Sequence, residues 1–258
     1  MLRPALLLLA LAASLTAEPV RQDHAKYAAA LKEFRSGKAA PVDALRDKAS
    51  APEVRRAAVD ALRERLLDEP SGPLAKAAAG LLAETDADTA RLLLAALAEA
   101  KVTSAADAVA ALAGKADSPV RVDAALALAE IGGARAVPLL AALAKDEALA
   151  ETVTEALGKT AGPGVTDAFI AGIKDKGLPA VSRTALIRAS VTRNNRAVAA
   201  ALCETVADED MRMESQKGLL RLATAADLSA LRKAEQSVSN EATKAALGRL
   251  IKKLEAAK

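Results

Sequence analysis

Residues 120–128 read Val-Arg-Val-Asp-Ala-Ala-Leu-Ala-Leu, and residues 54–62 read Val-Arg-Arg-Ala-Ala-Val-Asp-Ala-Leu. The two stretches share the form V-R-x-x-A-x-x-A-L. Its apolar positions fall at i, i+4, i+7 and i+8, which is the spacing of one face of an α-helix. The same stripe recurs, in softer form, at residues 89–97, 149–157, 181–189, 211–219 and 242–250, and residues 23–31 join the series only at their Ala30-Leu31 end. The last positions of successive copies lie 29 to 35 residues apart, which predicts a repeated helical unit.

A second helical segment is expected between each pair of stripes, because turn residues bound those stretches. Ser118-Pro119 marks a helix start, while Gly132-Gly133 and Gly162-Pro163-Gly164 mark helix ends. These second segments are predicted over residues 73–84, 104–115, 134–145, 165–174, 195–207 and 226–236. A helical hairpin with one apolar face cannot bury that face alone, so neighbouring hairpins must stack.

Residues 118–146 carry a likeness to a known family, since V-R-x-x-A-x-x-A-L is followed there by Ile-Gly-Gly and a second helix. This stretch resembles the HEAT-like repeats of bacterial proteins, of the PBS-lyase type. The resemblance extends over about residues 22–258. Its departures from the family pattern include Asp23 and Thr89 in place of the leading valine, Ala189 in place of the final leucine and Gly218 in place of the alanine. It implies an all-α fold, an α-solenoid in which antiparallel helix pairs stack into a right-handed, HEAT/armadillo-like superhelix.

Four segments are predicted along the chain: a signal peptide over residues 1–17, N-terminal capping helices over 18–49, HEAT-like repeats over 50–238 and a C-terminal capping helix over 239–258. Tyr27, Leu31 and Phe34 form an apolar stripe that closes the core at the first end. At the other end, Ser239 or Asn240 is expected to cap the last helix.

The N-terminus has the composition of a secretory signal. A positive start at Met1–Arg3 precedes the apolar residues 5–13 and the small residues 14–17, and cleavage after Ser14 or Ala17 is left open. The apolar run is shorter than the ~20 residues of a membrane-spanning helix, although an uncleaved anchor remains an alternative. We therefore expect a periplasmic or secreted protein with no stable membrane span after signal cleavage.

Composition limits the other classes of fold and function. The 258 residues are 52% hydrophobic but only 1% aromatic, which favours short stacked helices over a strand-rich fold. Lys and Arg number 36 against 33 Asp and Glu, and the two signs are interspersed, as on a solvated surface. The net charge of +3 does not by itself indicate a nucleic-acid partner, and the chain has no Trp for base stacking. No nucleic-acid binding is expected.

No set of catalytic, metal-binding or cofactor-binding residues emerges from the sequence. His24 is the only histidine and is expected to be an exposed residue at a helix start. Cys203 lies in an apolar helical context typical of packing, the alternatives being an intermolecular disulfide or covalent attachment of a ligand. Residues 208–210, together with Asp86 and Asp88, lack the spacing of a calcium loop and are expected to cap helices.

The densest basic stretch holds Arg183, Arg188, Arg193 and Arg196, which we take as candidate partner-binding residues. An arginine cluster on one repeat can bind an acidic partner, a phosphate or a lipid headgroup, whereas charged helix residues more often form a solvated face.

The leading hypothesis is a non-enzymatic exported scaffold or adaptor, monomeric, whose stacked second helices present a surface to a protein or peptide. Two alternatives stay open. The resemblance implies a HEAT-like chromophore lyase or isomerase that acts on bilins, because some HEAT-like repeats occur in such enzymes. A structural envelope spacer is the third possibility, and it would lack any saturable partner.

Overall fold

The fold is described by a computed structural model over residues 23–256, and every regular element in that range is helical. The predicted signal peptide lies outside the described residues. The helices that contain the eight aliphatic stripes, here called first helices, are α2 (His24–Arg35), α4 (Pro52–Asp68), α6 (Ala87–Glu99), α8 (Arg121–Ile131), α10 (Ala150–Lys159), α12 (Ala180–Thr192), α14 (Arg212–Leu222) and α16 (Glu241–Glu255). The helices between them, here called second helices, are α3 (Pro41–Arg46), α5 (Pro73–Leu81), α7 (Ala106–Gly114), α9 (Ala136–Leu143), α11 (Val165–Lys174), α13 (Ala199–Thr205) and α15 (Leu228–Ser237). The all-helical prediction is thereby confirmed for this part of the chain.

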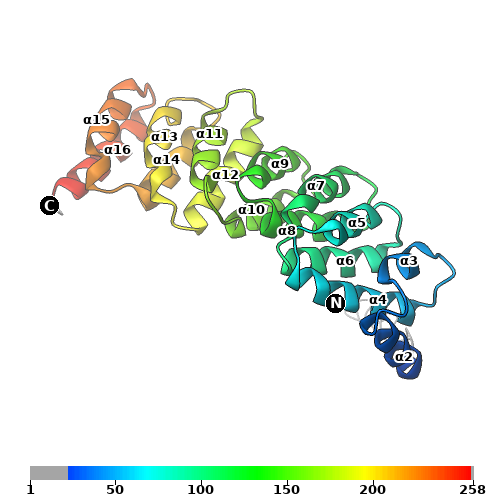
Figure 1. The fold of residues 1–258 in the computed structure, drawn as a ribbon. Coiled ribbons are helices and arrows are strands. Elements are labelled where there is room, and N and C mark those ends of the chain that lie inside the picture. The colour runs from blue at the N-terminus through cyan, green and yellow to red at the C-terminus, as the bar shows by residue number, and fades with distance from the viewer. Residues whose placement is uncertain (1–22, 257–258) are drawn as a thin grey trace, which may run out of the picture.

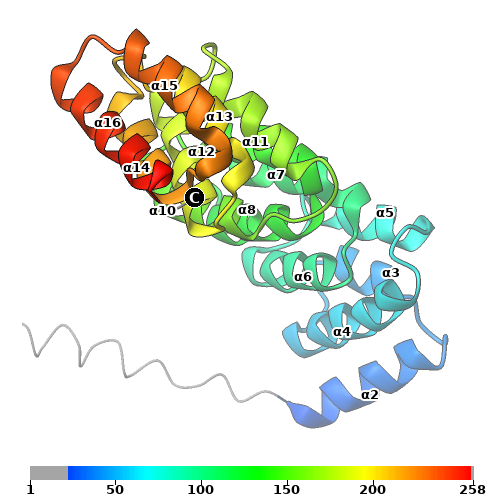
Figure 2. The same cartoon turned by 90° about the vertical axis from the view of Figure 1, so that its left-hand side faces the viewer.

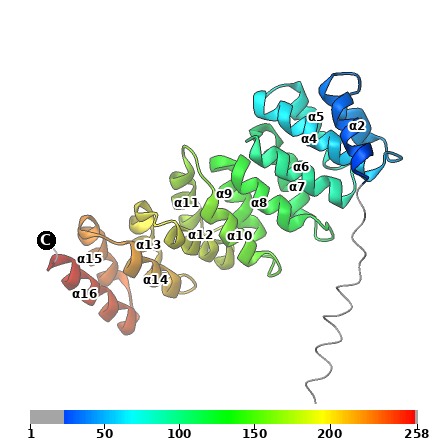
Figure 3. The same cartoon turned by 90° about the horizontal axis from the view of Figure 1, so that it is seen from below.

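The helices form two layers. Each first helix packs against the next one, from α2 through α16, and each second helix packs against the next, from α3 through α15. Figure 1 shows the resulting row, which runs from the blue N-terminal helices to the red C-terminal ones. The rotated views in Figures 2 and 3 show the same order along the row. Contacts are therefore made mainly between helices that are close in sequence.

The core runs between the two layers and is built from alanine and branched aliphatic side chains. Leu62 and Leu128, which end the two clearest stripes, are both fully buried. The alanines one turn earlier, Ala58 and Ala125, are also fully buried, and their small side chains allow neighbouring helices to approach closely. The aliphatic stripe read from the sequence is thus the buried face of α4, α6, α8, α10 and α14. On α12 it is not, since Val181 is 45% exposed and Arg188 is also exposed.

The turn residues act mostly as their sequence suggests. The α8 helix ends at Ile131, before Gly132 and Gly133. A Cβ atom on Gly132 would lie 2.5 Å from Ala136 Cβ, so this tight turn leaves no room for a side chain. Gly133 has a φ of 51°, in the left-handed region that favours glycine. The helix start predicted at Ser118 was wrong by a few residues, because α8 begins at Arg121.

Short 3₁₀ helices join four helix pairs and were not predicted as separate elements. They are η1 (Thr103–Ala105), η2 (Gly133–Arg135), η3 (Arg196–Val198) and η4 (Ala225–Asp227). Each lies directly before the second helix of its pair, so that α7, α9 and α15 begin two residues later than the sequence indicated, and α13 four residues later.

Helix α2 lies at one end of the row and helix α16 at the other. In α2, Phe34 is 3% exposed, and the Tyr27 hydroxyl donates a 2.8 Å hydrogen bond to Asp60 of α4. At the other end, the side chain of Asn240 accepts a 3.0 Å hydrogen bond from the backbone N–H of Thr243. The N-cap of α16 is therefore Asn240 rather than Ser239.

Candidate functional site

The four arginines singled out by the sequence do not form one surface patch. Arg183 of α12 is only 4% exposed. Its Nε–H donates a 2.9 Å hydrogen bond to the carbonyl of Ile173, and its Nη1 donates a 3.0 Å hydrogen bond to Asp208. The guanidinium is therefore used to tie α12 to the end of α11 and to the loop before α14. Arg183 was predicted to bind a partner, and this prediction is corrected because its charged group faces the interior.

Arg193 is also engaged within the fold. Its Nη1 donates hydrogen bonds of 2.6 Å to the carbonyl of Thr160 and 3.3 Å to that of Leu157. The guanidinium carbon lies 5.0 Å from the ring centroid of Phe169, a cation–π distance. Burial lowers the pKa of Arg193 below its usual range. This arginine holds the end of α12 against α10 and α11.

Arg188 and Arg196 are the exposed members of the set. Arg188 lies on the outer face of α12 and donates hydrogen bonds of 3.3 and 3.2 Å to the two carboxylate oxygens of Glu214 on α14. Lys217 Nζ lies 3.1 Å from the same carboxylate. Arg196 is the first residue of η3, which connects the first helix α12 to the second helix α13. Only these two arginines remain available as partner-binding candidates.

The interaction between Arg188 and Glu214 makes a testable prediction about titration. The hydrogen bonds from Arg188, and next those from Lys217, hold the pKa of the Glu214 carboxyl below its ordinary value of 4.5. A carboxyl with a lowered pKa adds stability that is present above its unfolded pKa and is lost as the pH falls through its folded pKa. NMR titration should therefore give a pKa below 4.5 in the wild-type protein and a higher one in Arg188→Gln. An unchanged Glu214 pKa in that variant would contradict the ion pair.

The large apolar side chains that remain exposed share one layer of the molecule. All six that are described lie on first helices: Leu67 on α4, Leu92 on α6, Val122 on α8, Val181 on α12, and Met213 and Leu220 on α14. The sequence had suggested that the second helices provide the binding surface. Second helices instead expose small residues at comparable positions, such as Ala142 and Ala171. The candidate interaction surface is therefore the layer of first helices.

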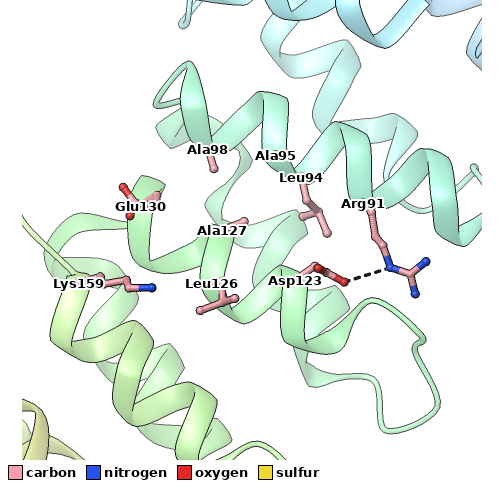
Figure 4. A pocket seen from close by; sticks show the side chains of 9 residues that line it. All are labelled: Arg91, Leu94, Ala95, Ala98, Asp123, Leu126, Ala127, Glu130 and Lys159. Atoms are coloured by element: carbon pink, nitrogen blue, oxygen red, sulfur yellow. Dashed lines mark hydrogen bonds and ion pairs between the residues drawn. The ribbon is translucent and has the colours of Figure 1, made fainter. Parts of the chain in front are cut away.

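Grooves run between neighbouring helices of this layer. Figure 4 shows the groove between α6 and α8, where Leu94 and Leu126 lie among short alanine side chains. Arg91 of α6 donates a 3.3 Å hydrogen bond to Asp123 of α8 at one end, and Lys159 of α10 lies at the other. A second groove lies between α10 and α12, and a third between α12 and α14.

The remaining candidate residues from the sequence have structural roles or lie at the surface. Asp86 accepts a 3.0 Å hydrogen bond from the backbone N–H of Thr89 and caps α6, as predicted. Asp208 was predicted to cap a helix, but its carboxylate instead pairs with Arg183. His24 is the exposed first residue of α2. Within residues 23–256, no cluster of His, Cys, Asp and Glu is arranged to hold a metal ion, and no helix is long and apolar enough to cross a membrane.

Cys203 of α13 is buried, which agrees with a packing role, and this burial predicts its reactivity. Burial raises the pKa of the Cys203 thiol to about 12, so the thiolate is scarce at neutral pH. We expect the folded protein to resist a thiol reagent such as DTNB, and the unfolded protein to react in full. Rapid labelling of the folded protein would contradict this placement.

The chain matches no model of a known protein family and no curated protein.

The residues that the sequence analysis missed are the exposed Leu220 and Met213, which lie off the aliphatic stripe of α14. A helical projection could have found them, since residues 213, 217 and 220 recur at helical spacing on the face opposite the buried one.

Proposed function

We propose that this chain is a HEAT-like α-solenoid that acts as a non-enzymatic, exported scaffold or adaptor for a protein or peptide partner. The sequential packing of first helices against first helices, and of second helices against second helices, supports a stacked solenoid. The periplasmic or secreted location rests on the signal sequence predicted over residues 1–17. The monomeric state is part of the same proposal.

One observation carries the binding role: the exposed large apolar side chains are gathered on the first helices. Such side chains lose water-exposed area when a partner covers them, at roughly 25 cal/mol per Å² of apolar surface. The grooves between α6 and α8 and between α12 and α14 lie in the same layer. Together they offer an extended face with repeated apolar positions, which suits an elongated partner better than a small ligand.

The non-enzymatic part of the proposal rests on the two residues best suited to nucleophilic or acid–base chemistry. Cys203 is buried with a raised thiol pKa, the opposite of an activated nucleophile. His24 is exposed at the first turn of α2, with Lys26 and Asp23 as its near neighbours in sequence. Neither residue lies in the grooves described above.

Site-specific photocrosslinking in the native envelope tests this proposal. A photoreactive amino acid would be placed at Leu92, Val122 or Leu220 on the first helices, and at Ala142 or Ala171 on the second helices as matched controls. We expect the first-helix positions to crosslink one dominant protein, which then binds the purified chain saturably. Crosslinks at neither layer, or crosslinks confined to the control positions, would contradict the proposal.

A further inference from the structure

The groove between α12 and α14 has an excess of positive charge. Arg188, Lys217 and Arg221 line it together with a single carboxylate, Glu214. Glu214 is already paired with both Arg188 and Lys217. Arg221 is exposed and has no ion pair within the described part of the chain. The groove therefore has two more cationic groups than anionic ones, and part of this charge is uncompensated.

The other grooves of the same layer do not share this charge. The α6–α8 groove is balanced, with Arg91 and Lys159 against Asp123 and Glu130. The α10–α12 groove is lined by two carboxylates and one cation, which are Glu147, Glu151 and Arg188. The excess of cations thus belongs to the α12–α14 groove rather than to the whole face.

Apolar side chains line the same groove. Leu220 is 50% exposed on α14, and Val191 is half-buried on the facing side of α12. Ile187 and Gly218 form the floor between them and are buried. Close packing explains why residue 218 is glycine, because a Cβ atom there would lie 2.7 Å from Leu202 Cδ1 and 3.2 Å from Ile187 Cγ2. The two helices therefore stay close, with a shallow apolar floor between their charged rims.

We propose that the α12–α14 groove binds an acidic segment of a protein partner, with an apolar side chain against Val191 and Leu220 and flanking carboxylates facing Lys217 and Arg221. This inference rests on the proposed binding function and specifies the chemistry of the partner. Exposed ion pairs supply orientation and selectivity, while the covered apolar surface supplies most of the affinity.

A protein segment fits this groove better than an anionic membrane does. The neighbouring α10–α12 groove exposes the carboxylates of Glu147 and Glu151 on the same layer. A flat anionic surface laid across α12 and α14 would meet these carboxylates and be repelled. A narrow segment that follows one groove avoids them.

Fluorescence anisotropy with synthetic peptides tests the inference. The probe is a labelled peptide in which Leu and Glu residues alternate along the sequence. One control peptide carries Lys in place of Glu, and the other carries Ser in place of Leu. We expect saturable binding of the first peptide only. Leu220→Ser and Arg221→Glu should each weaken it by about tenfold, because each removes one of the two recognition elements.

Matched controls separate this groove from the rest of the surface. Leu67→Ser removes a side chain of nearly equal exposure, 49%, from α4, and Arg249→Glu reverses an exposed charge on α16. Neither should change binding of the acidic peptide. Equal binding of the acidic and basic peptides, equal effects of the control variants, or no binding of the acidic peptide would overturn the inference.

Two further outcomes distinguish the causes of failure. Binding to phosphatidylglycerol vesicles in preference to the acidic peptide, lost in Arg221→Glu, would overturn the peptide assignment in favour of a lipid surface. Crosslinking of a partner at Leu92 and Val122 but not at Leu220 would overturn this inference while leaving the proposed binding function intact.

Discussion

Replacing Phe169 by alanine is expected to lower the free energy of unfolding by about 3–5 kcal/mol, the usual cost of truncating a buried aromatic ring. Phe169 of α11 is fully buried and is among the largest such side chains in the protein. Its ring also lies under the Arg193 guanidinium, so the variant loses a cation–π contact as well as apolar burial. Arg193 would then keep only its hydrogen bonds to the carbonyl of Leu157 on α10 and to that of Thr160 at the C-terminal end of α10.

Urea denaturation followed by far-UV circular dichroism measures this loss as a lower transition midpoint. Phe169→Leu, which refills much of the volume, should recover part of the stability. Leu220→Ala, which truncates a half-exposed side chain, should change it by no more than about 0.5 kcal/mol. A loss at Phe169→Ala no larger than that of Leu220→Ala would show that α11 does not pack into the core as described.

Removing the carboxylate of Asp208 is expected to cost about 3–5 kcal/mol, because a buried cation is left without its counter-ion. The side chain of Arg183 is 5% exposed, and its Nη1 lies 3.0 Å from Asp208 Oδ2. An equivalent pair joins Arg121 to Asp146, at the same separation of 25 residues in sequence. Each pair links the start of a first helix to the loop that follows the next second helix.

The same urea denaturation tests this second effect, with a control in the same acidic run. Asp208→Ala should be strongly destabilised, whereas Asp210→Ala should change stability by no more than about 0.5 kcal/mol, since Asp210 is exposed. Adding Arg183→Met to Asp208→Ala should recover much of the loss, because the double variant buries no unpaired charge. Equal losses for the two aspartates would refute a structural role for the ion pair.

The sequence predicted the helices well because one physical signal repeats along the chain. The stripe that ends at Leu62, Leu97 and Leu128 is the buried face of its helix in each case, since apolar side chains at helical spacing must be covered. Helix boundaries were less accurate. The start of α8 and the 3₁₀ helices depend on how each loop packs, which local sequence does not specify.

The candidate site was harder to predict, because the charge of a residue does not reveal whether its charged group faces solvent or contacts the interior of the protein. Arg183 and Arg193 look like surface residues in a basic stretch, yet both reach back to carbonyls of preceding helices. Those contacts are between residues 10 to 36 positions apart, beyond what helical periodicity can show. Arg188, by contrast, is exposed on α12, although it occupies the i+7 position of the stripe predicted over residues 181–189.

Small-angle X-ray scattering on monomeric residues 23–256 tests the stacked row most directly. Eight first helices spaced by about 8–10 Å produce an elongated particle with an expected radius of gyration of about 21–25 Å. A compact globule of this chain length would give about 17–18 Å. A value in the upper range with an elongated distance distribution is the predicted result, and a value in the lower range would contradict the stacking of successive helix pairs.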